Sequence, residues 1–282
     1  MNYKHVYHAG NFADVTKHVL LCMLIECMRR KDSPFCYIDT HAGSGCYDLF
    51  SEFANKTKEY EHGIEKIIHH DNPPAPVKQY IRVIHDINNH LTSSKFGSLR
   101  FYPGSPMLAK HLIRPTDRIV ACELHPDEFQ SLKNMFIGDK HIAIHHTDGF
   151  LGLKAFLPPR EKRGLILIDP PYEDPDEFTH IIHSLAIALK RFESGVYVIW
   201  YPIKEMNHVE KFYRTLKRDI NHDIFVAELT IYPDLPNHLN GCGLAVINPP
   251  WKFDGSVQEI LPWLWKALTI NQQGQFRAYH LK

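Results

Sequence analysis

The sequence predicts an α/β protein with a seven-stranded, largely parallel sheet whose last strand runs in the opposite direction, together with a small helical insertion. Three observations indicate this fold. Short apolar segments alternate with longer amphipathic ones, the pattern of strands joined by helical crossovers. Several of the apolar segments end at an acidic residue. The last two are joined by a link too short for a helical crossover, so they should be antiparallel.

The composition is that of a soluble globular protein. With 282 residues, 44% of them hydrophobic, the chain can bury one large core. Lys and Arg number 32, as do Asp and Glu, so no net charge attracts a nucleic acid. The six cysteines show no CxxC spacing, which predicts reduced thiols and no metal site. Without a signal peptide or an apolar run of about 18 residues, we expect a cytoplasmic protein outside the membrane.

Residues 1–13 combine aromatic and basic side chains ahead of a helix predicted at about Asp14–Arg30. Tyr3 and Lys4 stand in this segment, whose composition is typical of surfaces that stack bases and contact phosphates. A frayed terminus is the alternative interpretation. His18 falls on the apolar side of the helix, which by periodicity alone favours a buried core histidine.

A strand at Phe35–Ile38 ends at Asp39 and leads into a glycine loop that contains His41 and Gly43. A strand, an acid and a glycine loop outline a nucleotide-cofactor site, because glycine lets the backbone approach a ligand closely. The third glycine of the dinucleotide-binding fingerprint is missing, so a pyrophosphate site is disfavoured.

Residues 46–102 are predicted to be an insertion. The acid at the end of the next strand comes far later than the ~20 positions that usually follow such a loop. Two helices are expected inside the insertion, at Lys58–His70 and Val77–Leu91. The remaining residues, 1–45 and 103–282, then form the main domain.

Polar residues also follow the next two strands. A helix should begin at Ser105, which is predicted as its N-cap with proline behind it. The strand after it ends at Glu123, whose carboxylate could accept hydrogen bonds from both hydroxyls of a ribose. The strand Ile142–Ile144 leads to Asp148 and Gly149, where a carboxylate could bind an adenine amine. Each acid could instead cap a helix, but acids at consecutive parallel strand ends line one crevice.

The strand at Leu165–Ile168 is apolar throughout and stops at Asp169-Pro170-Pro171-Tyr172, called here the first tetrad. Its prolines fix an extended turn. The exocyclic amine of a nucleobase is a poor nucleophile because its lone pair is delocalised into the ring. Asp169 and the carbonyl of Pro170 could each accept one amine hydrogen, and Tyr172 offers a face for an extruded base. An ordinary rigid turn is the alternative.

The remaining elements are strands at Val196–Trp200, Phe225–Ile231 and Gly243–Ile247, with a helix at Lys204–Arg218. A second tetrad of the same type, Asn248–Trp251, follows the last strand. Because that strand should be reversed, its end lies at the opposite edge of the sheet from the acids. We therefore interpret the second tetrad as a structural turn.

A series of motifs runs in order along essentially the whole chain: YKHVYHAGNFADVTKH, DTHAGSG, YPGSP, ELHP, TDGF, RGLILIDPPYE, WYPI and INPPWK. Seven strands with the last reversed describe the Rossmann-like fold of S-adenosylmethionine-dependent methyltransferases. Within that fold, the motifs resemble the RlmJ family of bacterial 23S ribosomal RNA adenine N6-methyltransferases. Lys4 stands where arginine is expected in the family, and Ser44 where alanine is common.

The resemblance implies roles for several residues. His18 and His41 would line the methionine end of S-adenosylmethionine, which for His18 replaces the core role suggested by periodicity. Ser105 would lie in the same pocket, Glu123 would bind the ribose, and Asp148-Gly149 would contact the adenine. The expected cofactor site comprises His18, Asp39, His41, Gly43, Ser105, Glu123, Asp148, Gly149 and Asp169. The expected catalytic residues are Asp169, Pro170 and Tyr172, and the expected RNA contacts are Tyr3, Lys4 and Tyr172.

The implied reaction is direct methyl transfer to N6 of one adenine in protein-free 23S ribosomal RNA by a monomeric enzyme, with positioning supplying most of the rate. Two alternatives stay open at this point. A DNA adenine N6-methyltransferase could share the tetrad, and dependence on the 2′-hydroxyl would separate the two. A non-catalytic RNA-binding or assembly module could share the fold, and cofactor binding without turnover would identify it.

Overall fold

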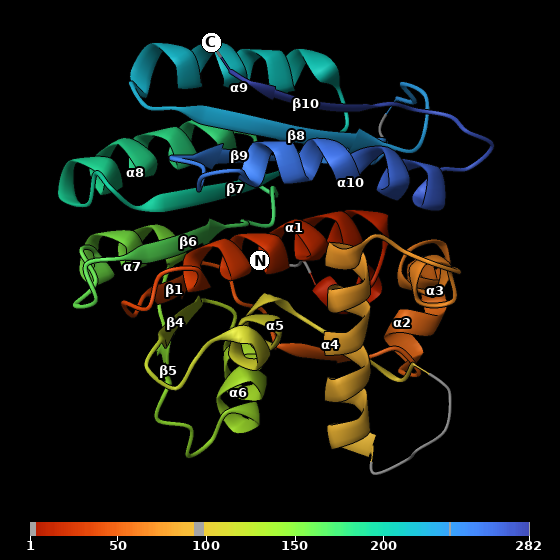
Figure 1. Cartoon of the computed structure of the whole chain (residues 1–282), viewed down its shortest axis with the longest axis horizontal. Helices are drawn as coiled ribbons and strands as arrows, with labels where there is room; N and C mark the ends of the chain where they lie inside the picture. Colours follow the sequence, from red (N-terminus) through yellow and green to blue (C-terminus); the bar gives the residue numbers. More distant parts are fainter. Residues whose placement is uncertain (1–3, 93–98, 237, 282) are drawn as a thin grey trace.

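The computed structural model describes residues 4–92, 99–236 and 238–281, and one open sheet crosses it with helices on both faces (Figure 1). The strand order is β10-β8-β9-β7-β6-β1-β4-β5. The strands are β1 (Cys36–Asp39), β4 (Arg118–Glu123), β5 (Ile142–His146), β6 (Gly164–Ile168), β7 (Val196–Ile203), β8 (Ile224–Thr230), β9 (Gly241–Ile247) and β10 (Phe276–His280).

Strand directions agree with the predicted reversal. The neighbours β5, β4, β1, β6 and β7 are parallel, whereas β9 is antiparallel to both β7 and β8. Within the described residues the main sheet has eight strands and not the predicted seven, because β10 pairs antiparallel with β8 at the sheet edge. No apolar run marks Phe276–His280, and its main-chain hydrogen bonds rather than a buried face define it as a strand.

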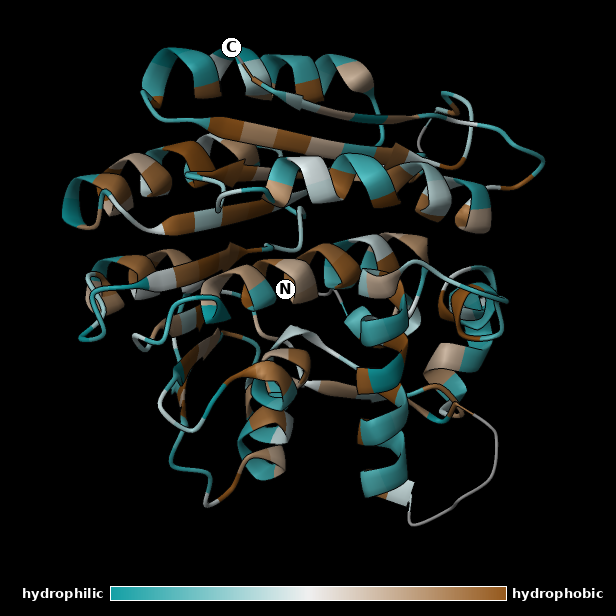
Figure 2. Ribbon diagram, viewed as in Figure 1, coloured by the Kyte–Doolittle hydropathy of each residue, from teal (hydrophilic) through white to brown (hydrophobic). Residues whose placement is uncertain are grey.

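Two hydrophobic cores lie on the two faces of the sheet. Along β6, Leu165 and Leu167 belong to one core and Ile166 and Ile168 to the other, which explains why this strand is apolar throughout. One face is covered by α1 (Phe12–Arg29), α5 (Ser105–Leu112), α6 (Pro126–Met135) and α10 (Phe253–Leu268). The other is covered by α7 (Gly149–Phe156), α8 (Glu177–Arg191) and α9 (Met206–Asp219). Figure 2 shows the apolar strands between helices whose outer sides are hydrophilic.

The segment 46–102 contains mostly short elements beside the start of α1 (Figure 1). They are β2 (Cys46–Asp48), α2 (Glu52–Thr57), the 3-10 helix η2 (Glu59–His62), α3 (Ile64–Ile68), α4 (Ala75–Thr92) and β3 (Phe101–Pro103), with β2 and β3 forming a separate antiparallel pair. The division of the chain into two domains stays a prediction. Among the described residues, no helix is both long and apolar enough to cross a membrane.

The single helix predicted at Lys58–His70 is divided in the structure. Lys58 adopts the left-handed conformation, with φ of 54°, and ends α2. Gly63 separates η2 from α3, and a Cβ atom there would lie 2.1 Å from the carbonyl oxygen of Gly10. Close contact between two backbones therefore interrupts the helix, and glycine is the residue that permits it.

Candidate active site

A pocket of about 250 Å³ opens at the carboxyl ends of the central parallel strands, beside the start of α1. Most of the residues predicted for the site line it: His18, His41, Gly43, Ser105, Glu123, Asp169, Pro170 and Tyr172. Asp39, Asp148, Gly149 and Lys4 do not line it. Tyr3 lies outside the described residues. Of the four acids predicted at the strand ends, Glu123 and Asp169 therefore line the pocket, whereas Asp39 and Asp148 do not.

Asp39 is completely buried behind the pocket. Its Oδ2 accepts hydrogen bonds from the Tyr37 hydroxyl at 2.8 Å and the Ser105 hydroxyl at 2.6 Å. Burial raises the pKa of this carboxyl to about 6, against the effect of the two donors. The prediction that Ser105 caps α5 is wrong, since Gly104 is the N-cap and Ser105 is the first helical residue. A buried carboxylate needs donors, and Ser105 supplies one instead of capping.

Glu123 closes the glycine loop against the end of β4. Its two carboxylate oxygens accept hydrogen bonds from the backbone N–H of Gly43 at 2.8 Å and of His125 at 2.7 Å. Burial raises the pKa of Glu123 despite these bonds. Each carboxylate oxygen has a second lone pair, so Glu123 can hold the loop and still accept a ligand hydroxyl.

Asp148 is the N-cap of α7, where its side chain accepts a hydrogen bond from Leu151 N at 2.9 Å. The helix-cap alternative therefore holds for this acid in the structure. Gly149 has a different requirement, because a Cβ atom there would lie 2.2 Å from the carbonyl oxygen of Thr40. The start of α7 thus packs directly on the loop that follows β1.

The two predicted histidines are buried differently. His18 is 1% exposed; its Nδ1 is hydrogen-bonded with the Tyr102 hydroxyl at 2.7 Å, and its Nε2 has no partner within the described residues. Burial lowers the pKa of His18 well below its ordinary value, and it lowers that of His41 to about 4. Both rings are therefore neutral at physiological pH. A buried ring nitrogen without a partner at a pocket wall is suited to a ligand's polar group.

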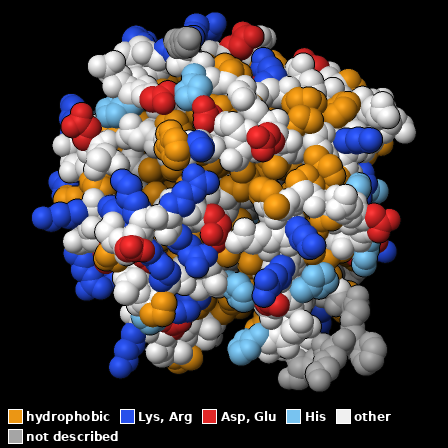
Figure 3. Space-filling view, viewed as in Figure 1, with side chains coloured by type: hydrophobic (Ala, Val, Ile, Leu, Met, Phe, Trp, Pro, Cys, Tyr) orange, Lys and Arg blue, Asp and Glu red, His pale blue; other side chains and the backbone are white. Residues whose placement is uncertain are grey.

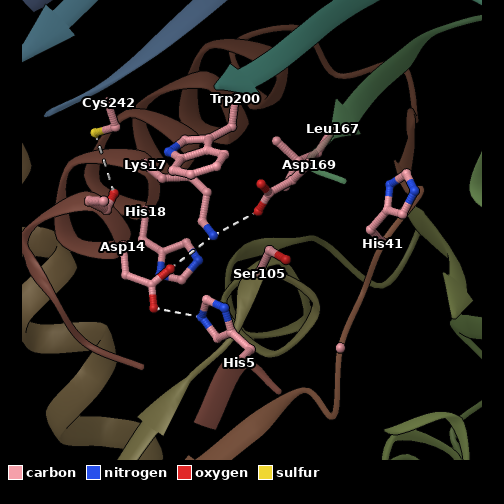
Figure 4. A network of polar contacts seen from close by, with 12 residues as sticks. His5, Asp14, Lys17, His18, His41, Ser105, Leu167, Asp169, Trp200 and Cys242 are labelled. Carbon is pink, nitrogen blue, oxygen red and sulfur yellow. Dashed lines mark hydrogen bonds and ion pairs between the residues drawn. The ribbon is translucent and has the colours of Figure 1, made fainter. Parts of the chain in front are cut away.

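Lys17 lines the pocket and was not predicted from the sequence. Its Nζ donates to Asp169 Oδ2 at 2.8 Å and pairs with Asp14 Oδ1 at 2.9 Å, although the side chain is only 6% exposed (Figure 4). Nζ also lies 5.6 Å from the ring centroid of Trp200. Burial opposes the charge on Lys17, but the two carboxylates outweigh it and hold its pKa well above the ordinary value.

Asp14 connects Lys17 to the N-terminal segment. It accepts hydrogen bonds from the backbone N–H of Gly10 at 3.0 Å, and its Oδ2 lies 2.8 Å from Nε2 of His5. Burial alone would raise the pKa of Asp14, but the interactions of its carboxylate with His5 and Lys17 outweigh this effect and hold the pKa well below the ordinary value. The spacing of Asp14 and Lys17, three positions apart in an apolar helix, is the sequence signal that could have identified the pair.

Tyr172 is held firmly at the end of the first tetrad. It has a φ of 54°, and its hydroxyl donates to the carbonyl oxygen of Trp200 at 2.5 Å. Its ring packs on Phe178 and Trp200, with centroids 5.2 and 5.8 Å away. The ring lines the pocket in a fixed orientation, which suits a stacking surface.

The second tetrad lies at the opposite edge of the sheet. The side-chain amide of Asn248 donates to the carbonyl oxygens of Glu193 at 2.8 Å and Gly195 at 2.9 Å, just before β7 begins. None of its residues lines the pocket. The turn interpretation of the second tetrad agrees with this position.

Comparisons with known proteins identify relatives over nearly the whole chain. The family model described as ribosomal RNA large subunit methyltransferase D, RlmJ, matches residues 32–281. Ribosomal RNA large subunit methyltransferase J of Escherichia coli K12 is 40% identical over 95% of this chain and 94% of the relative. The protein of that name from Haemophilus influenzae is 37% identical, covering 98% and 97%. A crystal structure of Legionella pneumophila protein LPL1258 superposes with a TM-score of 0.87 at 36% identity, covering 96% and 98%.

Proposed function

The chain belongs to the RlmJ family of ribosomal RNA large subunit methyltransferases. From this premise we propose that it methylates N6 of an adenine in 23S ribosomal RNA. The observation that carries the proposal is Asp169, an acid followed by two prolines and a fixed aromatic ring inside the pocket. The substrate is protein-free RNA, and the enzyme acts as a monomer in the cytoplasm.

S-adenosylmethionine is the methyl donor, and the pocket residues fit it. His18 presents an unpartnered buried nitrogen, and Glu123 has acceptor capacity for the ribose hydroxyls. His41 completes the set at the glycine loop. Asp39 supports this wall from behind through Ser105, and Asp148-Gly149 shapes the start of α7 beside it. When bound, the cofactor supplies a methyl group on a positively charged sulfur.

Asp169 and Pro170 act on the adenine. Each accepts one hydrogen of the N6 amine, the carboxylate through an oxygen and the proline through its carbonyl, and this localises the nitrogen lone pair. The carboxylate of Asp169 would then take the surplus proton of the methylated amine. Lys17 fixes the carboxylate from the other side, so the acceptor is positioned before the base arrives.

Tyr172 and the N-terminal segment hold the substrate. The ring of Tyr172 stacks on the extruded adenine, which leaves its helix most easily from a loop or mismatch. Tyr3 and Lys4 contact the RNA around it. Point substitutions test this better than a deletion of residues 1–10, because His5 and Gly10 bind Asp14 and their loss would disturb α1.

The test is transfer of tritiated methyl groups to a transcript of 23S ribosomal RNA, followed by nucleoside mass spectrometry. The expected product is N6-methyladenosine at one site, with little transfer to a DNA copy of the same sequence. Tyr3→Ala should reduce transfer while binding of S-adenosylhomocysteine stays unchanged. A methyl group on cytosine or on a ribose, or equal transfer to the DNA copy, would contradict the proposal.

A further inference from the structure

Phe53 exposes 43% of its surface on α2, although it is a large apolar side chain. Single exposed apolar residues are common, so the surroundings of the ring must decide its role. Two lysines flank it: Nζ of Lys4 lies 5.7 Å and Nζ of Lys56 5.5 Å from the ring centroid. Both lysine side chains are themselves exposed. An accessible ring close to two cations is typical of surfaces that bind single-stranded nucleic acid.

The ring is held in place by the N-terminal segment. Tyr7 packs edge-on against Phe53, with ring centroids 5.6 Å apart and an interplanar angle of 83°. The Thr57 hydroxyl donates to the carbonyl oxygen of Tyr7, which ties the end of α2 to the same segment. A fixed ring loses little conformational freedom when a base stacks on it.

The N-terminal segment links this ring to the active-site pocket. His8, the residue after Tyr7, lines the pocket and is hydrogen-bonded to Glu59 at 2.8 Å. Asn11 lines it as well and donates to the other oxygen of Glu59 at 2.9 Å. Glu59 of segment 46–102 therefore binds two residues that line the pocket. A strand of RNA that leaves the pocket can follow these residues toward Phe53.

We propose that Phe53, Lys4 and Lys56 form a platform for a nucleotide next to the target adenine. The base stacks on Phe53, and the two lysines move from the ring to the neighbouring phosphates. This inference rests on the proposed function and gives the helical insertion a role in it. The chain has no net charge, so local contacts of this kind must supply much of the affinity for RNA.

On the face seen in Figure 3, Lys and Arg are denser on the left half than on the right half, where α2 lies in Figure 1. A matched control for the platform exists elsewhere on the molecule. Trp251 is 78% exposed, and Nζ of Lys252 lies 4.3 Å from its ring centroid. Trp251 ends the second tetrad and Lys252 follows it, at the other edge of the sheet. The pair has the same chemistry without access to the pocket.

The first experiment compares Phe53→Ala with Trp251→Ala, using a protein-free 23S ribosomal RNA transcript. Phe53→Ala should raise KM for the transcript about tenfold, the effect of losing one base stack. Its kcat and its affinity for S-adenosylhomocysteine should match those of the wild type, and Trp251→Ala should change none of these values.

The second experiment measures the salt dependence of transcript binding by fluorescence anisotropy. Lys56→Gln should lower the slope of log Kd against log salt by about one, because one phosphate contact is lost. Lys252→Gln should leave the slope unchanged. A merely structural role for Lys56 would not alter this slope.

The platform is wrong if Phe53→Ala binds the transcript as tightly as the wild type, or if Trp251→Ala weakens binding equally. The proposed function is judged separately, by methyl transfer from the wild-type enzyme. If the wild type transfers no methyl group to the transcript, the proposed function fails, and the Kd values of the two variants for that transcript still decide for or against the platform.

Discussion

The two tetrads have nearly the same sequence but different surroundings. In the first, the acid Asp169 is paired with Lys17 at 2.8 Å and the aromatic Tyr172 is tied to Trp200 inside the pocket. In the second, Asn248 donates to two backbone carbonyls and Trp251 is 78% exposed. Both turns include a residue with φ near 55°, Tyr172 and Asn248 respectively.

The difference follows from strand direction. The first tetrad follows β6, which is parallel to its neighbours, so its acid meets the ends of β1 and β4. The second follows β9, which is antiparallel to β7, so Ile247 pairs with Tyr197 near the start of β7. A motif of this type is therefore a candidate active site only when the strand before it ends at the pocket.

The largest difference between the tetrads should appear in Asp169→Ala. We expect single-turnover methyl transfer to fall by about a thousandfold or more, because the amine loses its acceptor. Binding of S-adenosylhomocysteine should be retained in calorimetry. Asn248→Ala is the matched control and should keep its rate; an equal loss in both variants would show that strand direction does not separate them.

Lys17→Met tests the ion pair that distinguishes the first tetrad. It leaves the buried Asp14 and the half-buried Asp169 without their shared cation, so the free energy of unfolding at pH 7 should fall by about 3 kcal/mol. Asp14 has a lowered pKa in the folded wild type, so its contribution is present above its unfolded pKa and is lost as the pH falls through the folded value. The difference in free energy of unfolding between the variant and the wild type should therefore become smaller as the pH is lowered. Urea unfolding at pH 7 and at several pH values below the unfolded-state pKa of about 4 measures it, and a constant difference would contradict this account.

Asp39→Asn tests the buried charge behind the first tetrad. Burial raises the pKa of Asp39 to about 6, and the nearby Asp169 adds to this. Between about pH 4 and pH 6 the folded wild type therefore binds more protons than the unfolded chain. Because of this, the free energy of unfolding of the wild type decreases as the pH rises through that range. As the pH rises from 4 to 8, the free energy of unfolding of the variant should increase by about 2–3 kcal/mol relative to that of the wild type. Thermal unfolding across this range checks it, and the opposite trend would refute the assignment.

Asn248→Ala should lower the free energy of unfolding by about 1–2 kcal/mol, through two lost hydrogen bonds and a side chain with positive φ. Asn248→Gly separates these causes, because glycine tolerates the positive φ but cannot donate. We expect Asn248→Gly to be the less destabilised variant in denaturant titrations. Equal stability of all three proteins would mean that the second tetrad has no structural role.

The fold class and the family were predictable from sequence, and both are confirmed. The strands with continuous apolar runs, such as β6, were clear because both of their faces are buried. β10 was missed because pairing rather than burial defines it. The division at Gly63 was missed because it depends on a contact with Gly10, distant in the chain.

The site was predictable only in part. Residues at strand ends could be found, since topology alone brings them together. Lys17 could not be assigned to Asp169, because the two residues are 152 positions apart and nothing local connects them. Ser105 was given a local role as a helix cap, whereas the structure uses its hydroxyl for the buried Asp39.

The position of α1 has a consequence for the order of folding during synthesis. This helix precedes every strand of the sheet along the chain, but it packs against β9 and α10, which follow most of the other elements (Figure 1). Cys242 Sγ lies 3.9 Å from the carbonyl oxygen of Ala13, a contact between the two ends of the chain. Such long-range contacts form slowly. Part of the apolar surface of α1 can pack early against α4 and α5, but the part that contacts β9 and α10 stays uncovered until those two elements have been synthesised.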